Sequence, residues 1–262
     1  MQTDDPPRCY ALVPCAGTGA RSGLALPKQY VRLAGRPLVG HTLAALAAVP
    51  RLAAILVVLA PDDERFETCF SGPLPARCRP VRCGGPTRAA TVTAGLEALA
   101  ASGAREHDWV LVHDAARCLL RPAWVERLMD ACLGDAVGGL LALPLADTLK
   151  QEREGRVAAT LDRGGKWAAQ TPQMFRLGPL RAALAAAGPD VTDESSAVEA
   201  QGLAPRLVTG DVANFKVTWP ADFVLAERLL AQGYSASRPG DLAAPGGAPG
   251  VGLAGADTGV HA

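Results

Sequence analysis

The residues best suited to chemistry begin with a run of small residues that ends in a cation. The segment Pro14-Cys15-Ala16-Gly17-Thr18-Gly19-Ala20-Arg21 directly follows a short apolar stretch. Small residues let a ligand approach the backbone, and consecutive N–H groups can bind phosphate oxygens. Arg21 would add a fixed positive charge. A plain turn between a strand and a helix explains the same pattern, so the segment alone does not establish a phosphate site.

The same glycines superficially resemble a dinucleotide-binding fingerprint, but the rest of that pattern is missing. Ser22 stands where GxGxxG requires its third glycine. The second apolar run ends at Leu59-Ala60, without the acid that would bind a ribose. The sequence therefore disfavours NAD binding.

Lysine is rare in this chain, so each lysine carries more information than each arginine. Of the 26 basic residues, the lysines are Lys28, Lys150, Lys166 and Lys216. Lys28 lies in Leu26-Pro27-Lys28-Gln29-Tyr30, where a proline-fixed loop would present it beside a phosphate site. A cation held there can stabilise negative charge that develops during a reaction. An ordinary surface lysine is the alternative.

A further polar cluster, His113-Asp114-Ala115-Ala116-Arg117, lies where the apolar run 109–113 ends. Ligands of parallel α/β sheets bind at the carboxyl ends of the strands. Asp114 could bind substrate hydroxyl groups or help order Mg²⁺ there, and Arg117 could hold a substrate phosphate. The alternative is that these two residues simply pair with each other.

Apolar runs that alternate with Ala/Leu-rich stretches predict the scaffold that positions these segments. Strands are expected at 9–14, 54–59, 109–113, 137–144 and 206–209, and helices at 37–49, 89–102, 122–133, 178–187 and 220–232. Strands that are apolar throughout and separated by helices are typical of a parallel sheet covered on both faces. The predicted fold class is α/β, a doubly wound, mostly parallel sheet flanked by helices.

Three segments depart from this alternation. Residues 145–167 are polar and basic, and they predict an extended β-arm that leaves the main body. Residues 1–8 are expected to be a flexible N-terminus, and residues 9–234 the folded domain. Residues 235–262 are dominated by Gly, Ala and Pro, so they cannot bury enough surface to offset the entropy of ordering; this predicts disorder.

Composition restricts the partners and the compartment. The formal net charge is zero, which argues against a nucleic acid or an anionic membrane as the main partner. Apolar residues make up 49% of the chain, yet no run approaches the ~18 apolar residues that a membrane span requires. The seven cysteines form no CxxC pair and no secretory leader is visible, which favours reduced thiols in a cytoplasmic protein.

The segments GxGxR, PKQY and HDAAR, in this order, resemble the 2-C-methyl-D-erythritol 4-phosphate cytidylyltransferase family. Further similar segments, within residues 10 to 228, are Gly84–Val92 (GGPTRAATV), Thr171-Pro172-Gln173, Thr192-Asp193-Glu194 and Asn214–Thr218 (NFKVT). The resemblance implies a Rossmann-like nucleotidyltransferase fold. It also implies transfer of CMP from CTP to a sugar-alcohol phosphate, with release of pyrophosphate, in isoprenoid precursor synthesis.

The resemblance also implies roles for individual residues. The catalytic cations would be Arg21, Lys28 and Lys216. The nucleotide would be bound by Pro14, Cys15, Ala16, Gly17, Thr18, Gly19, Gly85, Arg88, Thr91 and Ala115. The second substrate would be bound by Asp114, Arg117, Thr148, Arg163 and Thr171. Mg²⁺ would be held mainly by the CTP phosphates, with Asp114 as the candidate protein ligand.

The arm carries an implication for assembly, because in the family the equivalents of Thr148 and Arg163 reach the substrate of the neighbouring subunit. The resemblance therefore implies a homodimer.

Four positions depart from the family's pattern: Pro86, Cys118, Ala213 and Trp219. Pro86 stands where an acid that contacts ribose is frequent, so backbone is expected to hold the ribose. Two alternatives remain. A cytidylyltransferase for ribitol 5-phosphate or another polyol phosphate is disfavoured by the residues after Asp114. A non-catalytic nucleotide-binding protein is disfavoured because it would need neither Lys28 nor Lys216.

Overall fold

A seven-stranded sheet forms the centre of the protein, in the order β11-β7-β10-β6-β1-β4-β5. The computed structural model describes residues 5–17, 26–187 and 191–232. The segment predicted to be a disordered tail and half of the predicted flexible N-terminus lie outside this range. Within it, Arg8 is fixed to the body, because its backbone N–H and its guanidinium both donate to the carboxylate of Asp108.

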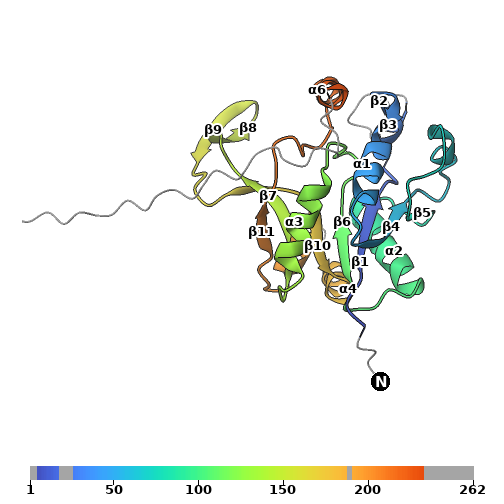
Figure 1. Cartoon of the computed structure of the whole chain (residues 1–262). Helices are drawn as coiled ribbons and strands as arrows, with labels where there is room; N and C mark the ends of the chain where they lie inside the picture. Colours follow the sequence, from blue (N-terminus) through green and yellow to red (C-terminus); the bar gives the residue numbers. More distant parts are fainter. Residues whose placement is uncertain (1–4, 18–25, 188–190, 233–262) are drawn as a thin grey trace, which may run out of the picture.

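Helices cover both faces of the sheet (Figure 1). The strands of the sheet are β1 (Cys9–Pro14), β4 (Leu52–Val58), β5 (Cys78–Val81), β6 (Trp109–Val112), β7 (Gly138–Pro144), β10 (Trp167–Arg176) and β11 (Arg206–Thr209). The helices are α1 (Leu38–Ala47), α2 (Arg88–Ala101), α3 (Pro122–Cys132), α4 (Leu177–Ala186), α5 (Glu194–Glu199) and α6 (Pro220–Ala231). The smaller elements are η2 (Lys28–Tyr30), β2 (Arg32–Leu33), β3 (Arg36–Pro37), η3 (Glu67–Cys69), β8 (Leu149–Arg153) and β9 (Arg156–Leu161). None of these helices combines the length and the apolar character that a bilayer crossing requires.

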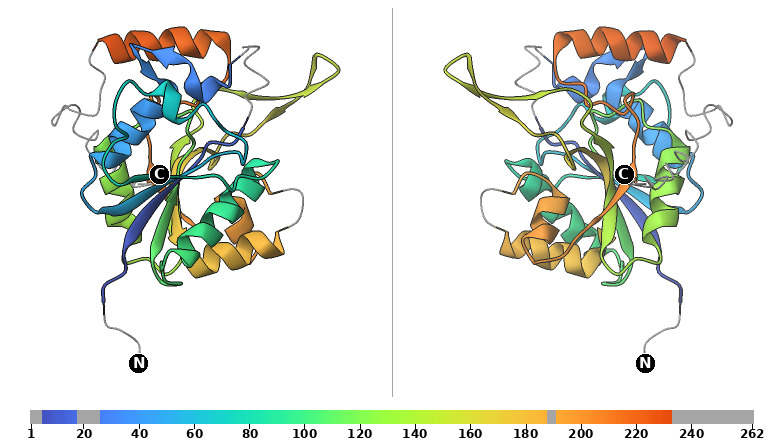
Figure 2. Two further views of the ribbon diagram at one scale, coloured as in Figure 1. Left: turned by 90° about the vertical axis from the view of Figure 1, so that its right-hand side faces the viewer. Right: turned by 90° about the vertical axis from the view of Figure 1, so that its left-hand side faces the viewer.

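The alternating side chains of β1 show why this strand is apolar throughout. Cys9, Ala11 and Val13 pack in one core cluster with residues of α1 and α3. Tyr10 and Leu12 point to the opposite face and pack with residues of α2 and α4. Figure 2 shows the two helix pairs on opposite sides of the sheet. Both faces of the strand are therefore buried, as expected for a central parallel strand.

The strand directions confirm the predicted doubly wound, mostly parallel sheet. β1 is parallel to β4 and β6, β4 to β5, and β7 to β11. The exception is β10, which runs antiparallel between β6 and β7. The strand β10 has no apolar run that would predict it, because its centre, Gln170-Thr171-Pro172-Gln173, carries polar side chains although it is buried. The short edge strand β5 is likewise absent from the predicted strands, since its sequence CRPV contains Arg and Pro.

The order of the strands places a ligand-binding edge beside β1. From β1 the chain proceeds to β4 and β5 on one side, and then returns to β6 on the other side of β1. At such a switch point the loops after the two strands diverge and leave a crevice at their carboxyl ends. The loop that begins at Cys15 and the loop that begins at His113 therefore flank the same crevice.

The predicted arm is confirmed as an antiparallel hairpin of β8 and β9 that projects away from the sheet (Figures 1 and 2). Its surface includes large apolar side chains, of which Val157 is 65% exposed.

A small third core cluster attaches the C-terminal part of the domain to the crevice. Val217 and Ala226 are buried there with Leu33, Leu38 and Cys118. The N–H of Val217 donates to the carbonyl of Ala116 at 2.9 Å. The segment that precedes α6 is thereby fixed against the loop after β6, which determines where Lys216 lies.

We predict that Gly95→Ala destabilises the protein, although alanine is the better helix former. A Cβ at Gly95 would lie 2.6 Å from Cγ2 of Val58 and 2.8 Å from Cδ1 of Leu12. Overpacking of this kind costs about 1–3 kcal/mol. Because the Cβ would crowd two side chains, we expect the upper part of this range, above the gain of about 1 kcal/mol from helix propensity. Urea denaturation measures the difference. Gly134→Ala is the control, because a Cβ there meets no atom within 4 Å. An unchanged or increased stability of Gly95→Ala would contradict this packing.

Candidate active site

A cleft of about 600 Å³ opens at the carboxyl ends of β1, β4 and β6. Its walls bring together residues from the predicted segments and a few others: Pro14, Cys15, Ala16, Gly17, Lys28, Gln29, Ala60, Pro61, Gly84, Gly85, Pro86, Thr87, Arg88, Thr91, Asp114, Ala115, Ala116 and Lys216. The segments predicted to bind a nucleotide therefore share one cavity, as far as the structure describes them. Thr18, Gly19 and Arg21 lie outside the described residues.

Gln29, which was not among the predicted site residues, connects the first two motifs. Its buried side-chain amide donates to the carbonyls of Cys15 (3.2 Å) and Gly17 (2.8 Å). These bonds hold the backbone of the glycine-bearing loop against η2, where Lys28 is the neighbouring residue. The sequence feature that could have indicated this role is the position of Gln29 beside Lys28, in a loop that was already expected at the site.

Glycine at position 84 allows a second loop to approach the first. A Cβ at Gly84 would lie 2.5 Å from Cβ of Ala16 and 2.7 Å from the carbonyl oxygen of Leu59. Only glycine fits this contact without displacing backbone. Thr91 holds this second loop, because its buried hydroxyl lies 2.9 Å from the carbonyl oxygen of Thr87 and 3.1 Å from that of Gly85. This side of the cleft thus presents mainly fixed backbone groups. Pro86, one of the positions that depart from the family's pattern, also lines it.

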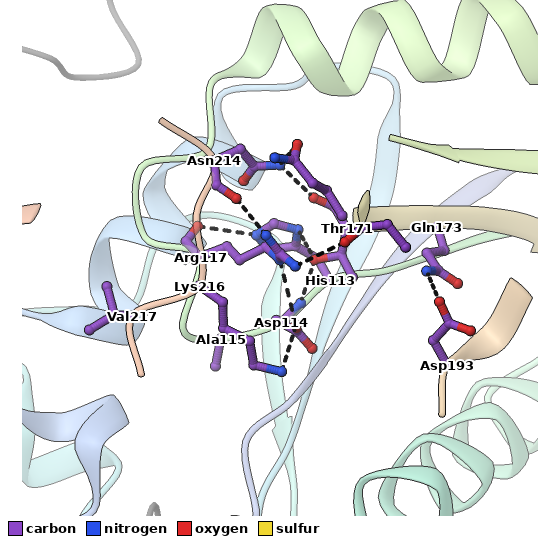
Figure 3. Close-up of polar contacts among 12 residues, drawn as sticks. His113, Asp114, Ala115, Arg117, Thr171, Gln173, Asp193, Asn214, Lys216 and Val217 are labelled. Atoms are coloured by element: carbon purple, nitrogen blue, oxygen red, sulfur yellow. Dashed lines mark hydrogen bonds and ion pairs between the residues drawn. The ribbon is translucent and has the colours of Figure 1, made fainter. Parts of the chain in front are cut away.

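The two lysines predicted to be catalytic line the same cleft, although they lie far apart in the sequence. The ammonium group of Lys28 donates to the carbonyl of Val217 at 3.0 Å. Lys216 forms an ion pair with Oδ2 of Asp114 at 2.9 Å, and Figure 3 shows its side chain directed at that carboxylate. The segment that carries Lys216 therefore contacts both the other lysine and the loop after β6.

Asp114 is the common partner of three cations. Its buried carboxylate contacts Arg88 through Oδ1 at 2.9 Å, and Lys216 and Arg117 through Oδ2 at 2.9 and 3.6 Å. Burial by itself would raise the pKa of Asp114. The charges of Arg88, then Lys216 and Arg117, more than offset this effect and hold the pKa well below its ordinary value. The carboxylate is therefore ionised at neutral pH.

A buried chain of hydrogen bonds fixes the turn that contains Asp114 (Figure 3). The N–H of Asp114 donates to the hydroxyl of Thr171 at 3.0 Å. That hydroxyl lies 3.0 Å from Nδ1 of His113, whose Nε2 lies 3.3 Å from the carbonyl oxygen of Arg117. One proton arrangement satisfies all three contacts: Thr171 donates to Nδ1, and Nε2–H donates to Arg117. A neutral His113 thus joins both ends of the turn.

Two residues predicted to touch the second substrate have protein partners in the structure. Thr171 lies behind Asp114 and is not among the residues that line the cleft. Arg117 is also absent from the lining; its guanidinium donates to the carbonyls of Asn214 (2.6 Å) and Ala169 (3.4 Å). The pairing of Asp114 with Arg117, which the sequence analysis kept as an alternative, occurs as a long contact within a larger network. In the structure, both Thr171 and Arg117 support the cleft wall.

The arm residues predicted to serve a neighbouring subunit lie away from this cleft. Thr148 and Arg163 are both exposed, at the base of the hairpin. The guanidinium of Arg163 donates to the carbonyl of Ala146. Neither residue lines the cleft of its own chain.

The donor groups of the cleft fit a metal ion whose ligands come mainly from a bound substrate. Among the described residues, no three His, Cys, Asp or Glu side chains gather as a metal site. Asp114 is the carboxylate in the cleft lining, and its oxygens already face Arg88 and Lys216. Mg²⁺ prefers oxygen ligands and is commonly bound through one or two carboxylates together with substrate phosphates. A triphosphate in the cleft would supply those phosphate oxygens.

We predict that His113 makes the stability depend on pH below neutrality. Complete burial lowers the pKa of His113 from 6.5 to about 4. Between these values the unfolded chain binds a proton that the folded chain does not. The free energy of unfolding should therefore fall as the pH falls from 6.5 to 4, by at most about 1.4 kcal/mol per pH unit from this group.

His113→Asn should reduce this dependence, and urea denaturation at pH 6.5, 5.5 and 4.5 measures it. His41, whose pKa burial also lowers, is present in both proteins, so the difference in slope isolates His113. Equal slopes in the two proteins would show that His113 is not held neutral.

Comparison with known proteins supports the resemblance seen in the motifs. The family described as IspD, 2-C-methyl-D-erythritol 4-phosphate cytidylyltransferase, matches residues 9–232. A protein of this name from Laribacter hongkongensis is 59% identical over 227 residues, which are 85% of this chain and 96% of that protein. The bifunctional enzyme IspD/IspF of Albidiferax ferrireducens is 63% identical over 229 residues, 87% of this chain; the match spans 54% of that longer protein.

Solved structures agree with the sequence comparison. A crystal structure of 4-diphosphocytidyl-2C-methyl-D-erythritol synthase is 40% identical and has a TM-score of 0.76, covering 86% of this chain and 98% of the other. The 2-C-methyl-D-erythritol 4-phosphate cytidylyltransferase of Thermus thermophilus is 33% identical with a TM-score of 0.70, covering 86% and 99%. With its family match over almost the whole described domain, the chain belongs to the 2-C-methyl-D-erythritol 4-phosphate cytidylyltransferase family.

Proposed function

We propose that this chain transfers the CMP group of CTP to 2-C-methyl-D-erythritol 4-phosphate, giving 4-diphosphocytidyl-2-C-methyl-D-erythritol and pyrophosphate. The observation that carries this proposal is the meeting of Lys28 and Lys216 in one cleft with the backbone of residues 14–17. The names of the similar proteins favour methylerythritol phosphate over ribitol 5-phosphate as the second substrate.

The reaction needs positive charge more than it needs a base. A phosphate oxygen of the second substrate attacks the α-phosphorus of CTP, and the bond to the β-phosphate oxygen breaks as pyrophosphate leaves. The attacking oxygen is already ionised near neutral pH, so no residue has to remove a proton. The obstacle is the approach of one anion to another, which fixed cations offset. Lys28 and Lys216 supply such charges, and Arg21 is proposed as a third.

The nucleotide is proposed to lie along the wall formed by residues 14–17 and the loop at Gly85. Fixed N–H groups of the first segment are suited to the triphosphate. Backbone groups near Gly85 can recognise the edge of a cytosine, and the hydroxyl of Thr91 holds this loop. Ala115, which also lines the cleft, adds backbone from the loop after β6.

Mg²⁺ is proposed as the cofactor, held mainly by the phosphate oxygens of CTP with Asp114 as the candidate protein ligand. The bound ion supplies further positive charge for the phosphate groups. Asp114 keeps its own role in this arrangement, because its carboxylate orients Lys216.

We predict that Lys28→Ala lowers kcat by about 10²–10³, the usual loss for one preorganised charge, while the Kd for CTP changes much less. The positive charge acts mainly on the crowded transition state, and the backbone of residues 14–17 remains to bind the ground state. Steady-state kinetics and calorimetry measure the two effects. Arg51→Ala, which removes an exposed cation paired with Glu126 and Asp130, is the control. An unaltered turnover of Lys28→Ala would remove Lys28 from this role.

We further propose that the active form is a homodimer joined through the arm, in which Thr148 and Arg163 contact the substrate of the other protomer. The support is that both residues are exposed on a projecting hairpin and do not line their own cleft.

We also propose a cytoplasmic location, which is supported by seven cysteines that are all free thiols.

Mixing two inactive variants tests the proposed homodimer, in which the arm of one protomer contacts the substrate of the other. We predict that Lys28→Ala and Arg163→Ala each lose most activity as pure proteins. Random exchange of protomers would leave one intact site in every mixed dimer, so the mixture should regain about a quarter of the wild-type activity. The activity after refolding the two together measures this, and a chain that carries both changes is the control. No gain from dimers shown to be mixed would mean that Arg163 serves its own chain or none.

A further inference from the structure

Glu194 is a buried acid for which the reaction described above has no use. It is the first residue of α5, and it is 1% exposed. Its two oxygens accept hydrogen bonds from the guanidinium of Arg88, at 2.7 and 3.0 Å. The third nitrogen of that guanidinium, Nε, donates to Oδ1 of Asp114 at 2.9 Å. Arg88 thus bridges a carboxylate outside the cleft lining and the carboxylate that orients Lys216.

The start of α5 does not need this acid as a cap. Asp193 already caps the helix, because its side chain accepts from the N–H of Ser196 at 2.9 Å. Gln173 of β10 fixes the same turn, accepting from the N–H of Ser195 and donating to Asp193, each at 2.7 Å. Glu194 is therefore held rigidly by its neighbours, and its side chain is left to bind Arg88.

Burial of a carboxylate is costly unless a partner compensates it. Burial raises the pKa of Glu194, and the charge of Arg88 and its hydrogen bonds offset only part of that rise. Both oxygens accept hydrogen bonds from one guanidinium, which is the geometry of an ionised carboxylate. In return, Glu194 and Asp114 together more than offset the burial of Arg88 and raise its pKa. The guanidinium is a planar fork with fixed donor directions, so binding both oxygens of Glu194 determines where Nε points.

We propose that Glu194 is a positioning residue for this reaction, acting through Arg88 and Asp114 on Lys216. With Glu194 in place, Arg88 donates only Nε to Asp114, which leaves Oδ2 to Lys216. Without the charge of Glu194, the whole guanidinium is drawn towards Asp114 or towards a bound phosphate. Arg88 then competes with Lys216 for the same carboxylate, and the ammonium group loses its fixed position.

This proposal also gives Arg88 a role different from the one that the resemblance implied. Arg88 lines the cleft, but its Nε, Nη1 and Nη2 donate to two carboxylates. In this proposal it acts on the nucleotide through Asp114 and the start of α2.

The inference rests on the proposed function, and kinetics of Glu194→Gln test it. The variant keeps the shape of the side chain and removes its charge. We expect kcat to fall about 10- to 100-fold, as for other small displacements of a reacting group, with a smaller change in the KM for CTP. Glu194→Asp keeps the charge but shortens the side chain, so it should recover part of the loss. Glu97→Gln is the matched control, since Glu97 binds Arg181 through both oxygens at an exposed site on α2.

A second background separates positioning from a merely structural role. In Lys216→Ala, whose residual turnover is followed with labelled CTP, Glu194→Gln should have almost no further effect, because the group it positions is gone. A structural role would lower kcat by the same factor in both backgrounds, and that result would overturn the inference. So would full activity of Glu194→Gln in the wild-type background.

Folding and function are checked independently of this outcome. Circular dichroism and thermal melting establish that the variants fold. If Glu194→Gln does not fold, Glu194→Asp is tested in both backgrounds, and the expected loss of kcat has the same pattern but is smaller. If the wild-type chain fails to release pyrophosphate from CTP with 2-C-methyl-D-erythritol 4-phosphate, the proposed function fails instead. An active wild type whose Glu194 variants behave like Glu97→Gln would overturn only the positioning role.

Discussion

The structure of the cleft depends on one buried carboxylate surrounded by cations. Arg88, Arg117 and Lys216 come from three separate parts of the chain, and their mutual repulsion would drive them apart without Asp114 between them. A single carboxylate does not neutralise three cations. Even with Glu194 bound to Arg88, an excess of positive charge remains, and Lys28, which lines the same cleft, adds to it. The same interaction thus assembles the site and leaves it attractive to phosphate groups.

The sheet makes this arrangement possible by placing polar residues where parallel strands would place apolar ones. β10 enters antiparallel next to β6, so that Thr171 lies behind Asp114 and hydrogen-bonds to its N–H and to His113. Gln173, in the same strand, fixes the start of α5 and therefore Glu194. The strand thus acts as a support for both carboxylates, which accounts for polar side chains in the middle of a sheet.

Sequence patterns predicted the helices and strands that contain mainly apolar residues. They missed the elements and site residues in which polar side chains are buried. The strand at 9–14 was predicted with its observed bounds, because an apolar run of that length reports burial directly. The strand at 206–209 also has its predicted bounds, although Val208 is its one buried residue. Gln29 and Glu194 were missed as site residues for the opposite reason. Each is a polar residue whose burial depends on a partner that is remote in the sequence, and no periodic pattern marks such a residue.

The sequence by itself determined the chemistry that was available: two informative lysines, a glycine-bearing loop after the first strand, and an Asp–Arg pair after the third predicted strand. Tertiary structure alone decided which of these groups meet. It directed Lys216 to Asp114 and turned Arg117 and Thr171 to supporting contacts. The physical reason is that an ion pair depends on distance and burial in space, and both are fixed by how distant segments pack.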